Sequence, residues 1–239
     1  MTRFRACYAN CAKWEQQRAR WPRLIRLLKR QHASVYLLTE APDEFLRDLA
    51  LALGWTSNRG DTCWITAPNR NSVLWNPRKW WFRQSDLTAL SRHEGDVADG
   101  KNRTAAWALL QRRTSGRQVW LGASHLSPNA GRTQAMGNLQ RTSQARALVG
   151  SLPGSPLLLG IDRNCNPSAT PALFLEQGLD FLTPKLGDTF AGRAGRQTLD
   201  GLYGHGVSLR WVRKVDPHDT TDHHVLRAGV TVTGGASAL

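Results

Sequence analysis

The sequence alternates between short apolar segments and turn-forming residues, and several of these segments stop abruptly at a polar side chain. VYLLT at 35–39 and PLLLGI at 156–161 are two examples. Apolar runs of this length, bounded by Gly, Pro, Asn or Asp, are typical of buried β-strands. The pattern therefore predicts a core built mainly from strands, with only a few helices.

The order of these segments predicts one α/β domain over residues 1–239. The expected helices are 14–31, 43–53, 133–151 and 169–177. The expected strands are 3–9, 34–39, 63–66, 71–75, 80–83, 103–111, 118–124, 156–161, 198–203, 209–215 and 225–232. The polar segment 91–102 is expected to be a loop. The simplest assembly is two mostly antiparallel sheets packed face to face, with the helices on their outer faces.

The charge balance indicates a polyanionic partner. Lys and Arg outnumber Asp and Glu by 32 to 18, which gives a formal net charge of +14. A field of this sign attracts polyanions, so nucleic acid is the first partner to consider and an anionic membrane surface the second. The basic residues of the first helix can be either solvated or in contact with phosphates; they are Arg18, Arg20, Arg23, Arg26, Lys29 and Arg30.

Cysteine and tryptophan usage predicts side chains of the core rather than of a site. No CxxC pair is present, and we expect four buried free thiols at Cys7, Cys11, Cys63 and Cys165. Five tryptophans are expected in the core, at Trp80, Trp81, Trp107, Trp120 and Trp211. No stretch approaches membrane-spanning length, and we expect a cytoplasmic monomer.

Six of the strand segments carry an amide, carboxylate or imidazole at one end. These residues are Asn10, Glu40, His125, Asp162, Asp200 and the pair Asp222–His223. A single residue of this kind, such as Asn10, fits a turn equally well. Six together argue for a shared site, because a rigid sheet holds strand-end side chains at one rim.

In this order the motifs resemble the endonuclease/exonuclease/phosphatase superfamily, the group of deoxyribonuclease I and the exonuclease III-type abasic endonucleases. The counterparts are YANCA (Asn10), YLLTEA (Glu40), GASHLSP (His125), GIDRN (Asp162 and Asn164), TLDGLY (Asp200) and TTDHH (Asp222 and His223). The resemblance covers residues 10–223. It implies a deoxyribonuclease I-like four-layer sandwich and metal-dependent hydrolysis of phosphodiesters.

The resemblance also implies a metal site of oxygen ligands. Glu40 is the first ligand, Asn10 lies beside it, and Asp222 serves a second or alternative position. Mg²⁺ is the expected cofactor, with Mn²⁺ as a substitute, because Mg²⁺ prefers hard oxygen ligands and keeps several waters.

The proton-transfer groups follow from the same resemblance. His223 is a general base or proton shuttle supported by Asp200. The unperturbed pKa of an imidazole lies near neutrality, which suits proton transfer. Asp162 and Asn164 orient the attacking water and bind the phosphate, and either Asp162 or His223 can be the base. His125 donates to the phosphate or to the leaving oxygen.

Three residues are expected to bind the substrate, and some motif positions differ from the family. Arg103, Asn129 and Arg132 are the expected contacts to the substrate backbone. Ile161 separates the usual Gly from Asp162, and Thr39 replaces the usual Gln. We find no convincing carboxylate partner for His125 in the sequence; the nearest are Glu94 and Asp96.

Together these features predict a DNA endonuclease of low sequence specificity. One alternative is a phosphatase that acts on phosphoinositides or another small phosphoester. Another is a catalytically silent nucleic-acid-binding module on the same fold, which would bind DNA with a steep salt dependence but not cleave it.

Overall fold

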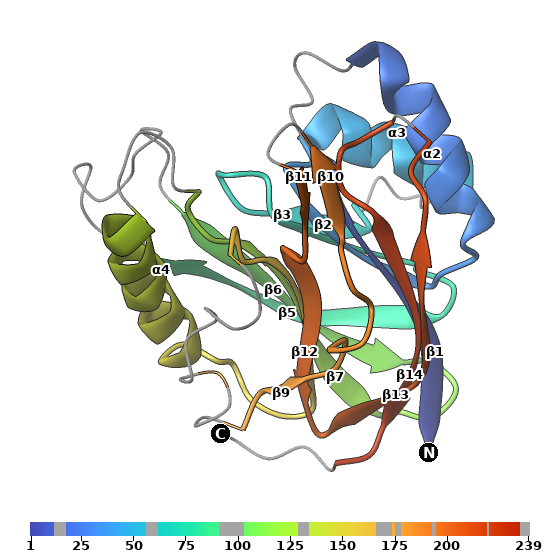
Figure 1. Ribbon diagram of the computed structural model, residues 1–239. Coiled ribbons are helices and arrows are strands. Elements are labelled where there is room, and N and C mark those ends of the chain that lie inside the picture. The colour runs from blue at the N-terminus through green and yellow to red at the C-terminus, as the bar shows by residue number, and fades with distance from the viewer. Residues whose placement is uncertain are drawn as a thin grey trace.

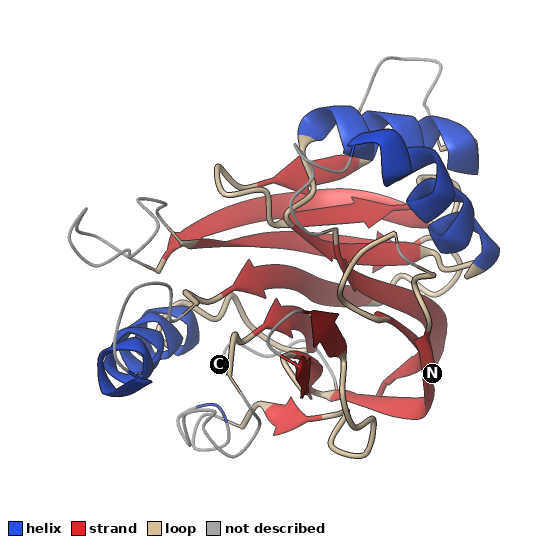
Figure 2. Ribbon diagram, turned by 45° about the horizontal axis from the view of Figure 1, so that its top comes forward, coloured by secondary structure: helices blue, strands red, loops and turns tan. Residues whose placement is uncertain are grey.

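Two six-stranded sheets pack face to face, and helices cover their outer faces (Figures 1 and 2). The structure is a computed structural model. It describes residues 1–11, 18–55, 62–90, 103–128, 134–165, 174, 178–192, 195–218 and 220–234. The expected sandwich architecture is confirmed.

The first sheet has the strand order β13-β14-β1-β2-β4-β3. Its strands are β1 (Thr2–Asn10), β2 (Val35–Thr39), β3 (Trp64–Thr66), β4 (Ser72–Trp75), β13 (Val207–Val215) and β14 (Val225–Val232). Only β1 and β2 pair in parallel; the other neighbours are antiparallel. The parallel pair fixes one edge of the sheet as the carboxyl end of both strands.

The second sheet repeats this arrangement, with the order β5-β6-β7-β8-β12-β9. Its strands are β5 (Trp80–Ala89), β6 (Thr104–Arg112), β7 (Gln118–His125), β8 (Leu157–Asp162), β9 (Asp180–Phe181) and β12 (Asp200–His205). Here β7 and β8 are the parallel pair. A separate antiparallel hairpin consists of β10 (Phe190–Gly192) and β11 (Gly195–Gln197).

The crossover connection of each parallel pair contains a helix. The short 3-10 helix η1 (Arg18–Arg20) and α2 (Trp21–Arg30) lie between β1 and β2, and α4 (Gln134–Val149) lies between β7 and β8. Parallel strands need such long crossovers, so the helices come to lie on the outer faces. A further helix, α3 (Asp43–Leu53), packs beside α2 and ends at Gly54, whose φ of 66° favours glycine.

The main core lies between the two sheets and under α2 and α3, and a smaller apolar cluster lies under α4. Trp80, Trp107 and Trp120 are buried, as expected. The core assignment was wrong for Trp81, which is 41% exposed, and for Trp211, which is only partly buried. Both lie on edge strands, β5 and β13, where one side of the strand meets solvent.

Most expected elements form close to their expected bounds. The strand expected at 80–83 continues to Ala89 as β5, and β9, β10 and β11 were not expected. The expected loop 91–102 lies outside the described residues, as does the helix at 169–177 except for Phe174. All four cysteines are buried and free. No described helix is both long and apolar enough to span a membrane.

Candidate active site

The two parallel strand pairs bring four of the expected residues to one end of the sandwich. In the first sheet Asn10 is the last residue of β1 and pairs with Thr39, which directly precedes Glu40. In the second sheet His125 and Asp162 are the last residues of β7 and β8 and pair with each other. Carboxyl ends of parallel strands share one edge, and this edge holds the candidate site.

The antiparallel neighbours begin at the same edge and add two more residues. Asp200 opens β12 and pairs with Asp162. His223 lies two residues before β14, whose partner is β1. The hydroxyl of Thr221 donates to the backbone oxygen of Asn10 over 3.0 Å and fixes the approach to His223.

Hydrogen bonds across the interface between the sheets join these residues. The Asn10 amide donates to Asp162 Oδ2 over 2.8 Å, and His223 Nδ1 lies 2.8 Å from Asp200 Oδ2. The Tyr8 hydroxyl donates to Asp200 Oδ1 over 2.9 Å. Tyr8 and Asn10 belong to the first sheet and His223 leads into its strand β14, whereas both carboxylates belong to the second sheet. The site therefore depends on both sheets.

A second imidazole lies on the other side of Asp162. His125 Nε2 is 3.4 Å from Asp162 Oδ2, and His223 Nε2 is 3.8 Å from the same oxygen. The side-chain nitrogen of Asn164 lies 2.7 Å from His125 Nε2. Because an amide nitrogen only donates, this contact makes Nε2 an acceptor and places the proton of a neutral His125 on Nδ1. That atom lies 3.5 Å from Glu40 Oε1.

Glu40 is thus a carboxylate near His125, a proximity that the sequence pattern did not indicate. The nearer candidates in sequence, Glu94 and Asp96, lie outside the described residues. Glu40 and Asn164 both have a positive φ, 55° and 51°. This conformation is uncommon for Glu, and such backbone strain gathers at functional sites.

Burial and charge shift the pKa values of two site residues. The pKa of Asp162 is raised to about 7, first by burial and then by the negative charge of Asp200, while His223 counteracts part of the rise. Burial alone lowers the pKa of His223, but Asp200, Asp162 and Asp222 together raise it to about 10. At neutral pH His223 is therefore a cation, and Asp162 is present in both its protonated and its ionised form.

The oxygen donors at the site suit a hard divalent cation. Asp222 Oδ1 is buried and has no hydrogen-bond partner among the described residues, and it lies 3.9 Å from His223 Nε2. The carboxylate of Glu40 is 30% exposed. Ligand atoms of Asp162, Asp200 and His223 also lie within 4.8 Å of one another. However, Asp200 already accepts from Tyr8 and contacts His223 Nδ1, so this trio suits proton transfer better than metal binding.

The expected substrate contacts are less well placed. Arg103 directly precedes β6 and is buried, and the pairing of Ala105 with Ser124 brings it close to the end of β7. Asn129 and Arg132 lie outside the described residues. Their roles stay predictions.

Two further residues support the site and were not found from the sequence. Tyr8 occupies the same face of β1 as Asn10, two residues earlier, and the period of a strand could have indicated it. The Phe190 ring packs edge-on against His223, with centroids 4.9 Å apart. Phe190 lies in β10, a strand too short to give a sequence signal.

Comparisons with known proteins identify the fold. No family profile and no curated protein sequence matches the chain. Solved structures match nearly all of it. An endonuclease/exonuclease/phosphatase from Bacteroides vulgatus has a TM-score of 0.75 and 13% identity and covers 97% of this chain and 100% of its own. TDP2 of D. rerio, in complex with a single-strand DNA product, has a TM-score of 0.72 and 12% identity, with coverages of 97% and 100%.

A third matching structure is a phosphatase for a sugar phosphate rather than a protein bound to DNA. The mannosyl-6-phosphatase of Bacteroides thetaiotaomicron has a TM-score of 0.69 and 13% identity, and the alignment covers 95% of this chain and 99% of that one. The chain therefore has the fold of the endonuclease/exonuclease/phosphatase superfamily, as the strand-end motifs predicted.

Proposed function

We propose that the chain is a divalent-metal-dependent phosphodiester hydrolase, and specifically a DNA endonuclease of low sequence specificity. The observation that carries this proposal is the set of contacts between the sheets, in which Asn10, Asp162, Asp200 and His223 meet at the edge that also holds Glu40 and His125. Phosphodiester hydrolysis needs an activated water, stabilisation of developing negative charge and a proton for the leaving oxygen.

The pKa shifts support an assignment of roles to Asp162 and His223. Asp162 accepts the proton of the attacking water, because its raised pKa lies near the operating pH, where a general base works best. His223 stays protonated and stabilises negative charge on a phosphate oxygen through Nε2, while Asp200 holds Nδ1. Of the two candidates for the base, we therefore propose Asp162 rather than His223.

His125 completes the set as a hydrogen-bond donor. Asn164 fixes its ring by contacting Nε2, so the proton on Nδ1 faces the side of Glu40. In our proposal this group donates to a phosphate oxygen or to the leaving oxygen.

Glu40, Asn10 and Asp222 would hold the metal ion. Their carboxylate and amide oxygens are the ligands that Mg²⁺ prefers, and Mn²⁺ can use the same ligands. When bound, the cation supplies neutralisation of charge on the phosphate. The amide nitrogen of Asn10 donates to Asp162, and its side-chain oxygen is the atom that we propose for the cation.

Two observations favour DNA as the substrate. The net charge of +14 attracts a polyanion, and one protein of the same fold is bound to single-strand DNA. The four free thiols are consistent with the reducing cytoplasm that we propose for it. The second candidate substrate is a small phosphoester, because another protein of this fold is a mannosyl-6-phosphatase.

A supercoiled-plasmid nicking assay tests the proposal. It compares Mg²⁺, Mn²⁺ and EDTA and includes Glu40→Ala, Asp162→Ala and His223→Ala, with Glu44→Ala on the exposed side of α3 as the control. We expect nicking only with metal, and losses of about 10²-fold or more in the three site variants. Full activity in EDTA, or in all three site variants, contradicts the mechanism.

The same preparation separates the alternatives. Release of phosphate from a sugar phosphate or an inositol phosphate, without nicking, supports the small-phosphoester phosphatase. Salt-dependent DNA binding without cleavage of any substrate supports the silent binding module.

A further inference from the structure

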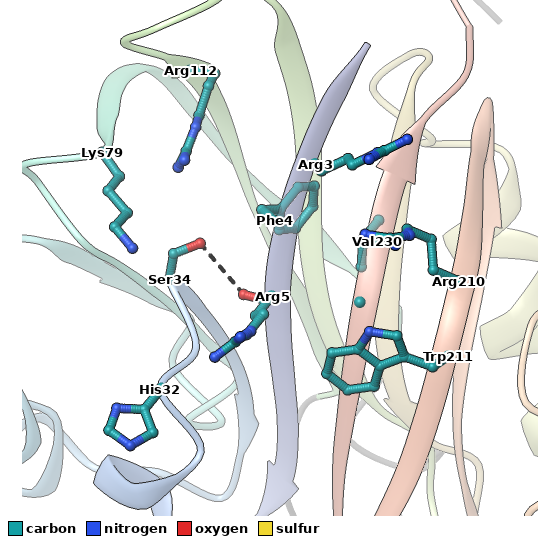
Figure 3. Close-up of a pocket in the computed structure, with 11 residues that line it drawn as sticks. Arg3, Phe4, Arg5, His32, Ser34, Lys79, Arg112, Arg210, Trp211 and Val230 are labelled. Carbon is teal, nitrogen blue, oxygen red and sulfur yellow. Dashed lines mark hydrogen bonds between the residues drawn. The ribbon is translucent and has the colours of Figure 1, made fainter.

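A cationic pocket lies at the end of β1 opposite to Asn10 (Figure 3). Its volume is about 450 Å³, and β1, β13 and β14 form much of its wall, together with residues next to β2, β5 and β6. None of its lining residues is Asp or Glu. Six of them carry basic side chains: Arg3, Arg5, His32, Lys79, Arg112 and Arg210.

The cations lie on both sides of β1. Figure 3 shows Lys79, Arg112 and Arg5 gathered around Ser34 on one side, whereas Arg3 and Arg210 lie on the side of β13 and β14. Arg3 and Arg5 alternate with buried residues in β1, so both point away from the second sheet. Arg3 and Arg5 thus contribute from the outer face of the first sheet, whereas Lys79, next to β5, and Arg112, the last residue of β6, come from the second sheet.

The floor of the pocket is a glycine between an arginine and a tryptophan. Gly229 pairs with Arg5 on one side and with Trp211 on the other, so the three residues form one row across β1, β14 and β13. A Cβ at Gly229 would lie 2.5 Å from Trp211 Nε1, so only glycine leaves room for the indole. Arg210 is the extra residue of a bulge between Leu209 and Trp211.

In the part of the chain that the structure describes, no carboxylate forms an ion pair with these charges, which include Arg3, Arg5, Lys79 and Arg210. The Nη1 atom of Arg112 is buried and has no hydrogen-bond partner. A cluster of like charges destabilises the compact state, and an anionic ligand would relieve that repulsion.

We propose that this pocket binds backbone phosphates of the nucleic-acid strand whose phosphodiester is cut at the other end of β1, with Trp211 as a platform for one of its bases. The inference rests on the proposed function. Its ligand chemistry follows from the pocket itself, because five Lys and Arg residues around a space of nucleotide size match phosphates. A partly exposed tryptophan suits base stacking without sequence preference.

Arg227 and Arg213 extend the basic surface from the pocket toward the catalytic edge. Arg227 pairs with Arg213, lies two residues closer to His223 than Gly229 does, and its guanidinium lies 5.3 Å from the Trp211 ring. From Arg5 to Asn10 the strand advances five residues, or about 17 Å. That distance corresponds to about five nucleotides at the 3.4 Å rise of one strand. Cations on two successive rows of the sheet, at the pocket and at Arg227 and Arg213, favour a polymer over a single lipid headgroup.

Fluorescence anisotropy with a labelled single-stranded DNA 20-mer tests the proposal in EDTA. The pocket variant is Arg5→Gln/Lys79→Gln/Arg210→Gln. The control variant is Arg47→Gln/Arg146→Gln/Lys185→Gln, which loses the same charge from exposed positions outside the pocket. We expect the pocket variant to bind about tenfold more weakly, with a salt slope smaller by about 2, and the control to bind almost as wild type does.

A second measurement uses a labelled trinucleotide, which is too short to span the two sites. Wild type should prefer the 20-mer, and most of this preference should disappear in the pocket variant. Thermal unfolding confirms that each variant is folded; if the triple variant is not, the three single substitutions are measured instead.

Equal weakening in the pocket and control variants would show that only net charge matters, and it would overturn the proposal. Unchanged binding by the pocket variant would do the same. Loss of binding to phosphatidylserine vesicles with DNA binding intact would assign the pocket to a membrane and also overturn it. These measurements report binding in EDTA, where the DNA is not cut. They therefore test the pocket even if the hydrolase proposal is wrong.

Discussion

His223, in the segment that leads into β14 of the first sheet, contacts Asp200 at the start of β12 in the second sheet, with Nδ1 and Oδ2 2.8 Å apart. Tyr8 donates to the other oxygen of Asp200, so each oxygen of the carboxylate has a partner from β1 or from the segment that leads into β14. Closing the sandwich therefore brings together the groups that we propose for proton transfer. The chemistry of the site and the packing of the two sheets depend on the same contacts.

Removing the charge of Asp200 should lower the pKa of His223. In wild type the imidazole should stay protonated through neutral pH and titrate near pH 10, because Asp200 offsets the effect of burial. In Asp200→Asn burial remains and the main opposing charge is gone, so the midpoint should move down by more than one unit. Histidine NMR titration in EDTA measures this shift. Asp216→Asn, next to exposed His218, is the control, and an unmoved His223 midpoint in Asp200→Asn contradicts the pairing.

Asp162 should make the protein less stable as the pH rises. Its folded-state pKa of about 7 lies above the unfolded value near 3.9, so the folded state holds the proton more tightly. Stability from this group is present below about pH 4 and is lost as the pH rises through 7. The loss is at most about 4 kcal/mol. Urea unfolding between pH 4 and 8 should show a flatter profile for Asp162→Asn, whereas Asp48→Asn should retain the wild-type slope.

Glu40→Gln should weaken metal binding more than it changes the fold. The substitution keeps the size of the side chain but removes the negative charge that a hard cation prefers. We expect the Mg²⁺ concentration for half-maximal nicking to rise by about 10–100-fold, and the Mg²⁺-induced rise in Tm to shrink. Glu44→Gln, exposed on α3, is the matched control. A wild-type Mg²⁺ response in Glu40→Gln would remove Glu40 from the metal site.

Most strands and helices could be predicted from the sequence, because the strands are short and apolar and end at distinctive polar residues. β2 and β8 were expected within a residue or two, since buried parallel strands are continuous apolar runs. The hairpin of β10 and β11 was missed because three residues carry no readable period. Trp81 and Trp211 were placed in the core because a strand pattern does not show which strands lie at an edge.

For the site, residue types could be predicted but partners could not. Motif order identified Asp162 and His125, but the proximity of Glu40 to His125 arises from long-range packing between the sheets. Tyr8 reaches Asp200 over 192 positions in the chain, a contact that no local pattern encodes. The pKa shifts depend on burial, which is likewise a property of the closed sandwich.

Gly160 should be intolerant of alanine, because Tyr8 occupies the space that a side chain would need. A Cβ at Gly160 would lie 2.4 Å from Tyr8 Cδ2 and 3.0 Å from Leu37 Cβ, so the tyrosine must move away from Asp200. Overpacking of this kind costs about 1–3 kcal/mol. Urea unfolding of Gly160→Ala should show that loss, together with a lower His223 midpoint by NMR if Asp200 shifts. In a Tyr8→Ala background the same substitution should cost much less, because the colliding ring is gone. An equal cost in both backgrounds would show that Tyr8 is not the obstacle and that Gly160 serves another need of β8.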